Sequence, residues 1–350
     1  MATPGIITPG ALNDLVATTL KELGRPKFTE IVSPLQRHTA MRNLLRKNRI
    51  QLRSGTAVQW DVMVNPANAA SNVGMAAQDS VNIVDLMTQA SADWRNTTAN
   101  YGIEGREIDM NAEPARIVDL IKARRIGAMI SLAELMERNF WGPPVALADV
   151  LTPWGINTWI VKNATEGFNG GAPSGYTSIG LNPTTYPNWK NWTYQYTNVT
   201  RDDLIRHWRK AATFIDFQPP VDGIPTFNTG DDYGWYTNYG VIGPLEEALE
   251  SQNDNLGPDI ASQDGKAMFR RVPVVWIPYL EADTTNPVYG LNWGWFKTYI
   301  LNNWWLRETH VPIYPGQHTM SAHFLDCTYQ WIAKNRRCHC VLATGTTYPS

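Results

Sequence analysis

The clearest pattern in the chain is a run of apolar residues at helical spacing between Ala112 and Asn139. One stripe of this run holds Ile117, Ile121, Ala128, Leu132 and Leu135. The stripe predicts a single long amphipathic helix. Asn111 stands where a cap is expected, and Gly142 follows the end of the run. At ~1.5 Å per residue the helix would be on the order of 40 Å long, enough for the spine of a domain.

An alternating segment precedes this helix and predicts a strand. From Thr56 to Val64, the side chains of Val58, Trp60 and Val62 fall on one face and those of Gln59 and Asp61 on the other. Residues 65 to 82 are small and polar, with too little apolar area to pack on anything. A return segment, residues 87 to 108, completes a long projecting hairpin. Its open edges would invite aggregation unless another chain covers them.

The rest of the chain mixes shorter helices and strands, which indicates an α+β fold. Further helices are expected over residues 11 to 23, 35 to 47, 201 to 215 (capped near Thr200) and 243 to 251. Strands are expected over residues 272 to 279 and, as one or two long strands, over residues 319 to 343, with an aromatic run at residues 286 to 305 before them.

Charge is distributed unevenly along the chain. The net charge of -2 and the pI near 6.3 argue against a protein that coats nucleic acid, so any such contact must be local. Residues 1 to 54, however, hold nine Lys and Arg against three acidic residues. Two interpretations stay open: a solvated helical face, or an arm that lies on neighbouring subunits or DNA. The candidate basic contacts are Arg37, Arg42, Arg46, Lys47 and Arg49.

Fifteen Trp and 14 Tyr are the compositional anomaly. Large amphipathic aromatics concentrate in cores and at protein contacts, although a carbohydrate-binding surface is the competing interpretation. Residues 293 to 305 are expected to be core. Trp60 and Trp94 are expected at contacts between subunits, because a thin hairpin has no core of its own. The candidate contact residues of the hairpin are Trp60, Asp61, Asp93, Trp94 and Arg95.

No pattern of reactive residues predicts an enzyme. Nucleophile and zinc-protease motifs do not occur in the sequence, and the glycine-rich stretch at residues 167 to 175 lacks the Gly-Lys-Ser/Thr ending of a phosphate loop. His323, Cys327, Cys338, His339 and Cys340 are an alternative candidate for a metal cluster, but the paired spacing of zinc sites is missing and buried thiols are favoured. We expect no catalytic, cofactor or metal site. There is also no run of about 18 apolar residues and no secretory signal, so neither a membrane nor export is expected.

Four segments in this order resemble the HK-97-like fold of tailed-bacteriophage major capsid proteins. They are the hairpin strand at Gly55 to Val64 with its small-residue tip, YGIEGREIDMNAEPARIVDLIKARR entering the long helix, FRRVPVVWIPYL at Phe269 to Leu280, and the closing pattern from Met320 to Leu342. The resemblance implies an N-terminal arm at 1–54 and an extended loop at 55–108. It also implies a peripheral domain with the spine helix at 109–150 and 285–335, and an axial domain at 151–284 and 336–350.

The resemblance also implies a function. Similar proteins assemble with themselves into hexamers and pentamers of an icosahedral head that encloses double-stranded DNA, in the virion, after assembly in the host cytoplasm. Portal and decoration proteins are further candidate partners, and DNA would contact the inner face non-specifically. Because no Lys lies between Lys47 and Lys122, a cross-link carried by the loop is not expected. The short N-terminal region indicates a separate scaffolding protein.

Two alternatives remain at this point. An encapsulin-like nanocompartment would share the fold without being viral. A tryptophan-rich carbohydrate-binding or hydrolytic protein would be a discrete monomer of a different class.

Overall fold

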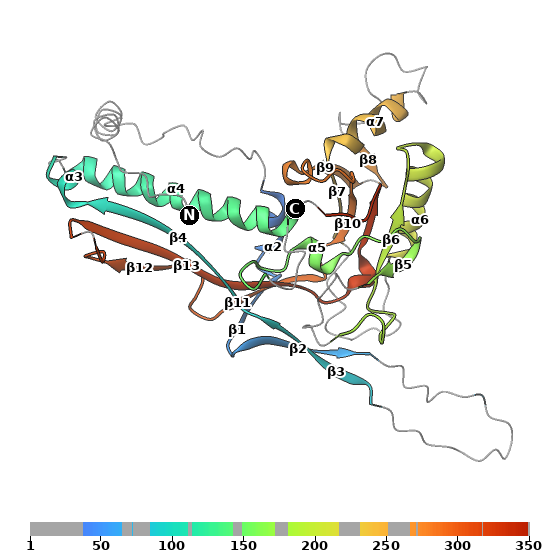
Figure 1. Ribbon diagram of the computed structural model, residues 1–350, viewed down its shortest axis with the longest axis horizontal. Helices are drawn as coiled ribbons and strands as arrows, with labels where there is room; N and C mark the ends of the chain where they lie inside the picture. Colours follow the sequence, from blue (N-terminus) through green and yellow to red (C-terminus); the bar gives the residue numbers. More distant parts are fainter. Residues whose placement is uncertain are drawn as a thin grey trace. The chain divides into compact units, whose positions relative to one another are not determined.

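The structure, a computed structural model, describes residues 38–64, 72, 85–110, 114–142, 149–171, 181–216, 232–250, 267–270, 272–316 and 318–348 (Figure 1). They fall into two compact units. The first contains residues 96–136 and 303–328, and the second contains residues 39–95, 137–302 and 329–350. Helices and strands occur in both, as expected for an α+β chain. No described helix is long and apolar enough to cross a membrane.

The first unit is built on strand pairs beside a long helix. Its elements are β4 (Arg95–Glu104), α3 (Gly105–Met110), most of α4 (Pro114–Trp141), β12 (Arg307–Val311) and the first part of β13 (Met320–Ala333). Strand β13 pairs with β4 and, antiparallel, with β12. Tyr101 and Ile103 of β4 pack with Ala128 of α4 and Leu325 of β13 to form the core of this unit. The long helix is therefore confirmed, two residues further along the chain than predicted, while its expected cap Asn111 lies outside the described residues.

The second unit contains a mixed sheet of seven strands. Their order is β5 (Gly167–Gly170), β6 (Asn191–Gln195), β14 (Cys340–Ala343), β10 (Val288–Asn292), β7 (Tyr233–Thr237), β9 (Val272–Trp276) and β8 (Met268–Phe269). The central strand β10 is buried along its whole length, with antiparallel neighbours on both sides. A core that includes Trp192, Trp208, Trp235 and Leu342 fills the space between the sheet and its helices.

The helices of the second unit include α2 (Thr39–Leu44), α5 (Ile156–Trp159), the π-helix η1 (Arg201–Ile205), α6 (Arg206–Phe214) and α7 (Tyr239–Glu250). The predicted cap is confirmed, because the Thr200 side chain accepts a hydrogen bond from the Asp203 N–H. Helix α7 begins four residues before the predicted start, and α2 is shorter than the predicted helix. The helix predicted at residues 11 to 23 lies outside the described residues.

One predicted strand ends early, and the predicted closing segment forms two strands. Strand β9 ends at Trp276, and a 3-10 helix, Pro278–Leu280, replaces the predicted end because Pro278 fixes its own φ and has no N–H to donate to a strand. The closing segment becomes β13 and β14, separated by a 3-10 helix at Arg336–Cys338. Cys338 and Cys340 therefore do not share a strand.

The aromatic run between residues 286 and 305 becomes two strands and a turn. After β10, strand β11 (Phe296–Leu301) pairs in parallel with β1 (Ile50–Arg53) and antiparallel with the end of β13. The Phe140 ring lies 5.1 to 5.8 Å from the rings of Trp141, Trp293, Phe296 and Trp331. Most of the 15 tryptophans are buried, which confirms the expected core position for Trp293 and Trp295. Trp304, at 37% exposure, departs from that expectation, and Trp276, at 39%, is exposed as well. The three cysteines are free and buried, and burial raises the pKa of Cys327 to about 11.

Candidate assembly interface

A two-stranded ribbon in the second unit is the candidate interface. Strand β2 (Ala57–Met63) and β3 (Met87–Asp93) pair antiparallel in unbroken register from Ala57 opposite Asp93 to Met63 opposite Met87 (Figure 1). Among the described residues, these strands pair only with each other. Each strand therefore keeps an outer edge of backbone N–H and C=O groups without a strand partner, which is the usual template for adding another chain. The predicted hairpin is confirmed for residues 57–63 and 87–93. The rest of its predicted return segment is not part of the ribbon, because β4 pairs with β13 and packs in the core of the first unit. The tip lies outside the described residues.

The two faces of the ribbon differ because successive side chains alternate. Val58, Ala90 and Ala92 lie on one face and are buried almost completely, so this face is attached to the body of its own unit. The opposite face carries Gln59 directly across from Ser91, and also Asp61 and Asp93 at other positions of the ladder. The alternation predicted from the sequence is therefore confirmed.

An exposed methionine pair ends the described ribbon. Met63 and Met87 lie opposite each other in the ladder, with 62% and 52% of their surface exposed. Opposed side chains in an antiparallel pair are close enough to form one apolar patch. Methionine adapts its shape to irregular surfaces, which suits a contact that differs slightly between copies of a subunit.

The candidate tryptophans of the ribbon contact their own chain. Trp60 is half-buried, and its ring centroid lies 6.5 Å from that of Trp159. Its indole Nε1 is buried and, among the described residues, has no hydrogen-bond acceptor. The Trp94 Nε1 donates to the Gly55 carbonyl at 2.9 Å, and the Gln330 side chain donates to the Asp93 carbonyl at 3.1 Å. These bonds fix the base of the ribbon and leave its outer part to project.

The charged candidates of the ribbon lie apart. Asp61 and Asp93 are exposed, whereas Arg95 is half-buried. No ion pair within the described part of the chain joins either carboxylate to Arg95. The role predicted for each of these residues at a subunit contact stays a prediction.

The basic segment divides into exposed and internal side chains. Arg42 and Lys47 are exposed. Arg46 and Arg49 both pair with Asp232, and Arg49, although charged, is 2% exposed. Arg49 also donates to the Asn43 carbonyl at 2.7 Å, so its charge is used within its own unit. Arg37 lies outside the described residues.

Glu137 fixes helix α2 next to this basic segment. Its two carboxylate oxygens accept from the Ala40 and Met41 N–H groups, each at 2.8 Å, and from the Trp141 indole at 2.9 Å. A carboxylate that satisfies the first N–H groups of a helix acts as its cap. No local pattern predicts this contact, because nearly a hundred residues separate Glu137 from α2.

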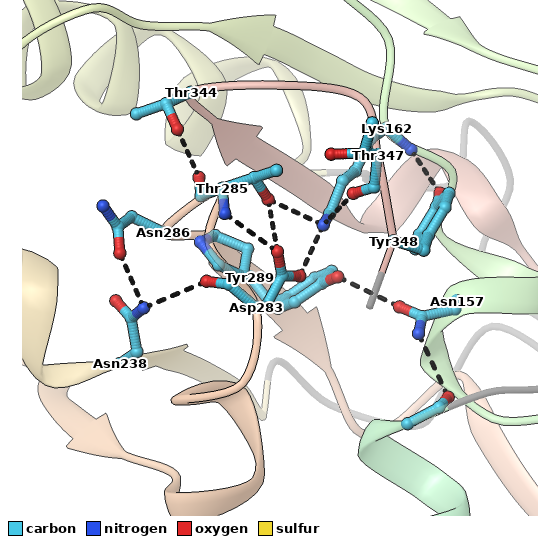
Figure 2. A network of polar contacts seen from close by, with 12 residues as sticks. Asn157, Lys162, Asn238, Asp283, Thr285, Asn286, Tyr289, Thr344, Thr347 and Tyr348 are labelled. Atoms are coloured by element: carbon cyan, nitrogen blue, oxygen red, sulfur yellow. Dashed lines mark hydrogen bonds and ion pairs between the residues drawn. The ribbon is translucent and has the colours of Figure 1, made fainter. Parts of the chain in front are cut away.

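A buried polar network, also not predicted, lies around Lys162 in the second unit. Figure 2 shows the Lys162 ammonium between the Asp283 carboxylate at 2.5 Å, the Thr285 hydroxyl at 2.8 Å and the Thr347 carbonyl at 3.0 Å. The Lys162 N–H in turn donates to the Tyr348 hydroxyl at 2.9 Å. Burial lowers the pKa of Lys162, and Asp283 opposes that shift. The network therefore holds the C-terminal segment on the domain body with one internal ion pair.

Comparison with known proteins places the fold among shells. No family model and no curated protein match the sequence. Among solved structures, the capsid of cyanophage A-1(L) is 14% identical, with a TM-score of 0.58, over 95% of this chain and 99% of that chain. The capsid of a native gene transfer agent particle is 11% identical, with a TM-score of 0.55, over 98% and 99%. The SrpI encapsulin of Synechococcus elongatus is 12% identical, with a TM-score of 0.51, over 96% and 97%.

Proposed function

From the HK-97-like fold that it shares with these shells, we propose that the chain is a shell-forming subunit, the major capsid protein of a tailed bacteriophage. Copies assemble into hexamers and pentamers of an icosahedral head around double-stranded DNA. One observation carries the proposal: the β2–β3 ribbon offers an apolar methionine patch and two edges that pair with no other described strand, in a chain that covers nearly the full length of known shell subunits.

The ribbon explains how association is specific without being tight at any one contact. A neighbouring copy covers Met63 and Met87, which removes apolar surface from water at roughly 25 cal/mol per Å². Asp61 and Asp93 add polar contacts at the rim, each surface ion pair being worth about 0–1 kcal/mol. Closed symmetric assembly repeats these small terms in every subunit.

Each region of the chain has a proposed place in the shell. We place the arm at 1–54, the extended loop at 55–108, the peripheral domain at 109–150 and 285–335, and the axial domain at 151–284 and 336–350. The exposed Arg42 and Lys47 suit non-specific contact with DNA phosphates or with a neighbour's acidic side chains. Scaffolding, portal and decoration proteins complete the set of partners, and the mature protein resides in the virion.

An encapsulin-like compartment is the second candidate, because an encapsulin is among the structures that share the fold. The contents of the particles separate the two functions. A phage head isolated from infected cells contains double-stranded DNA, whereas a compartment contains a protein cargo. The ultraviolet absorbance of purified particles detects packaged DNA, and their protein composition detects a cargo protein.

The test of shell formation uses the methionine patch. The double substitution Met63→Glu and Met87→Glu places two like charges opposite each other where a neighbour would dock, which is unfavourable both in the ladder and in the contact. The control is Met63→Leu with Met87→Leu, which keeps volume and apolarity. We expect subunits with an unchanged circular dichroism spectrum in both cases, but megadalton particles only for wild type and the leucine control.

Sizing with light scattering reads out this experiment. Particles of wild-type size from the glutamate variant would show that the ribbon is not needed for assembly. Monomers from wild type and from both variants would contradict shell formation altogether.

A further inference from the structure

Two histidines face each other across strands β12 and β13 in the first unit. His310 and His323 are direct partners in the antiparallel register, so their side chains leave the sheet on the same face. His310 Nδ1 lies 3.1 Å from His323 Nε2, and the ring centroids are 4.4 Å apart. Neither residue takes part in the assembly interface described above.

The separation of these nitrogens fits a shared metal ion. With Zn–N bonds of ~2.0–2.1 Å, two imidazole nitrogens on one tetrahedral ion stand about 3.3 Å apart, and on an ion with a right-angle arrangement about 2.9 Å apart. The observed 3.1 Å falls between these values. From this juxtaposition we propose that His310 and His323 bind a divalent transition-metal ion of the zinc class.

The surroundings hold His323 in the orientation that this site needs. The Tyr101 ring stacks on the His323 ring with centroids 4.8 Å apart and planes inclined by 2°. Glu308 Oε1 lies 3.8 Å from His323 Nδ1, the nitrogen that points away from His310. Glu308 is itself held by the Tyr101 hydroxyl and by Arg125 at 3.1 Å.

This arrangement matches the usual support of a metal-bound imidazole. A ligating histidine commonly directs its other ring N–H towards a carboxylate, which fixes the tautomer. With Nε2 on the metal, the proton of neutral His323 resides on Nδ1 and faces Glu308. Neutral His310 binds through Nδ1 and keeps its proton on Nε2. The ion therefore replaces the single hydrogen bond between the rings without a net change in protonation.

Access and coordination number follow from the strand positions. His310 is exposed, so an ion reaches the pair from solvent. Within the described part of the chain, no third His, Cys, Asp or Glu joins the pair as a ligand group. Water completes the coordination, and the affinity is lower than that of a structural zinc site with four protein ligands. The bound ion links the two strands at their matched pair.

Copper provides a direct spectroscopic probe of the site. After removal of metal from the full-length protein with a chelator, one equivalent of Cu²⁺ is added and the electron paramagnetic resonance spectrum is recorded. We expect hyperfine structure from two imidazole nitrogens in wild type. His310→Gln and His323→Gln should each remove one of them, while His318→Gln, which alters an exposed histidine outside the pair, should leave the spectrum unchanged.

Zinc titration by calorimetry gives the affinity. Either substitution in the pair should weaken Zn²⁺ binding by at least about tenfold, and Glu308→Gln, which removes the supporting carboxylate, by about 10- to 100-fold. Zinc binding that is absent from wild type, or equally strong in all variants, would overturn the proposal. So would a wild-type copper spectrum without two coordinated nitrogens, whatever the folding of the variants.

Discussion

Replacing Asp283 by Asn tests whether the Lys162 network carries a large part of the stability of its unit. The Lys162 and Asp283 side chains are 1% and 4% exposed. Asn keeps the shape of Asp and an acceptor for the Thr285 N–H and hydroxyl, which bond to Asp283 at 3.0 and 2.6 Å. The substitution therefore removes mainly the negative charge beside the Lys162 ammonium.

The expected loss in the free energy of unfolding follows from the Lys162 ammonium, which stays buried without its carboxylate partner. Breaking a buried ion pair on one side typically costs about 3–5 kcal/mol, because the other charge stays buried and uncompensated. Lysine can escape this cost by losing its proton. Deprotonating a lysine with an ordinary pKa of ~10.4 costs ~4.6 kcal/mol at pH 7, at ~1.36 kcal/mol per pH unit. This cost is the upper limit of the stability that the missing charge of Asp283 can remove. Burial already lowers the pKa of Lys162, so the expected loss lies within the same range of about 3–5 kcal/mol.

Thermal unfolding of unassembled subunits measures this loss. For a domain of this size, each kcal/mol shifts Tm by roughly 2–4 °C, so Asp283→Asn should lower Tm by about 6–20 °C. Asp202→Asn, at an exposed position in η1, is the control and should change stability by less than about 0.5 kcal/mol. The double variant Asp283→Asn with Lys162→Met should regain part of the loss, because no buried charge then remains. A Tm for Asp283→Asn within about 2 °C of wild type would refute the reasoning.

Two further predictions concern buried basic residues of the second unit. Burial lowers the pKa of His339 to about 3, so below its ordinary pKa of ~6.5 the unfolded chain takes up a proton that the folded chain does not. The free energy of unfolding of wild type should therefore fall by about 2 kcal/mol from pH 7 to pH 5. This dependence on pH should be weaker in His339→Gln and unchanged in the control His318→Gln. The same pH dependence in wild type and both variants would contradict the prediction. Arg336 is fully buried and donates to the carbonyls of Trp159, Trp189, Gly170 and Gly171 and to the Asn191 side chain. Lysine has only three donors for these five acceptors, so Arg336→Lys should lower the free energy of unfolding, measured with urea, by roughly 2–6 kcal/mol. The control Arg337→Lys, at the next residue, should lower it by less than about 1 kcal/mol. Similar losses in both variants would contradict a stabilising role for the buried bonds of Arg336.

Local sequence patterns were enough to predict the elements whose structure depends on near neighbours. The stripe of α4 and the alternation of β2 depend on residues three to four or two positions apart, and both are confirmed. The Thr200 cap is likewise confirmed, because a cap bonds within a few residues of itself. The strand predicted at residues 272 to 279 was wrong at its end, because Pro278 stops the strand although the apolar pattern continues past it.

Contacts between distant segments could not be predicted in this way. Lys162 contacts Asp283 and Thr347 only after the second unit has folded. The same holds for Arg336, which bonds to three separate segments of the chain. Glu137 reaches α2 for the same reason. His310 and His323 face each other only because of the register between β12 and β13. A shift of that register by one residue would place their side chains on opposite faces of the sheet. The sequence alone indicates that Glu308 and His310 share one face of a strand, because they are two residues apart. That observation identifies a site only once the register with β13 is known.

An electron cryomicroscopy map of the purified particles tests the central claim most directly. The account predicts closed icosahedral shells in which residues 57–63 and 87–93 of each copy lie against an adjacent copy, with Met63 and Met87 covered. Discrete monomers, or shells in which that methionine pair faces solvent in every copy, would contradict it.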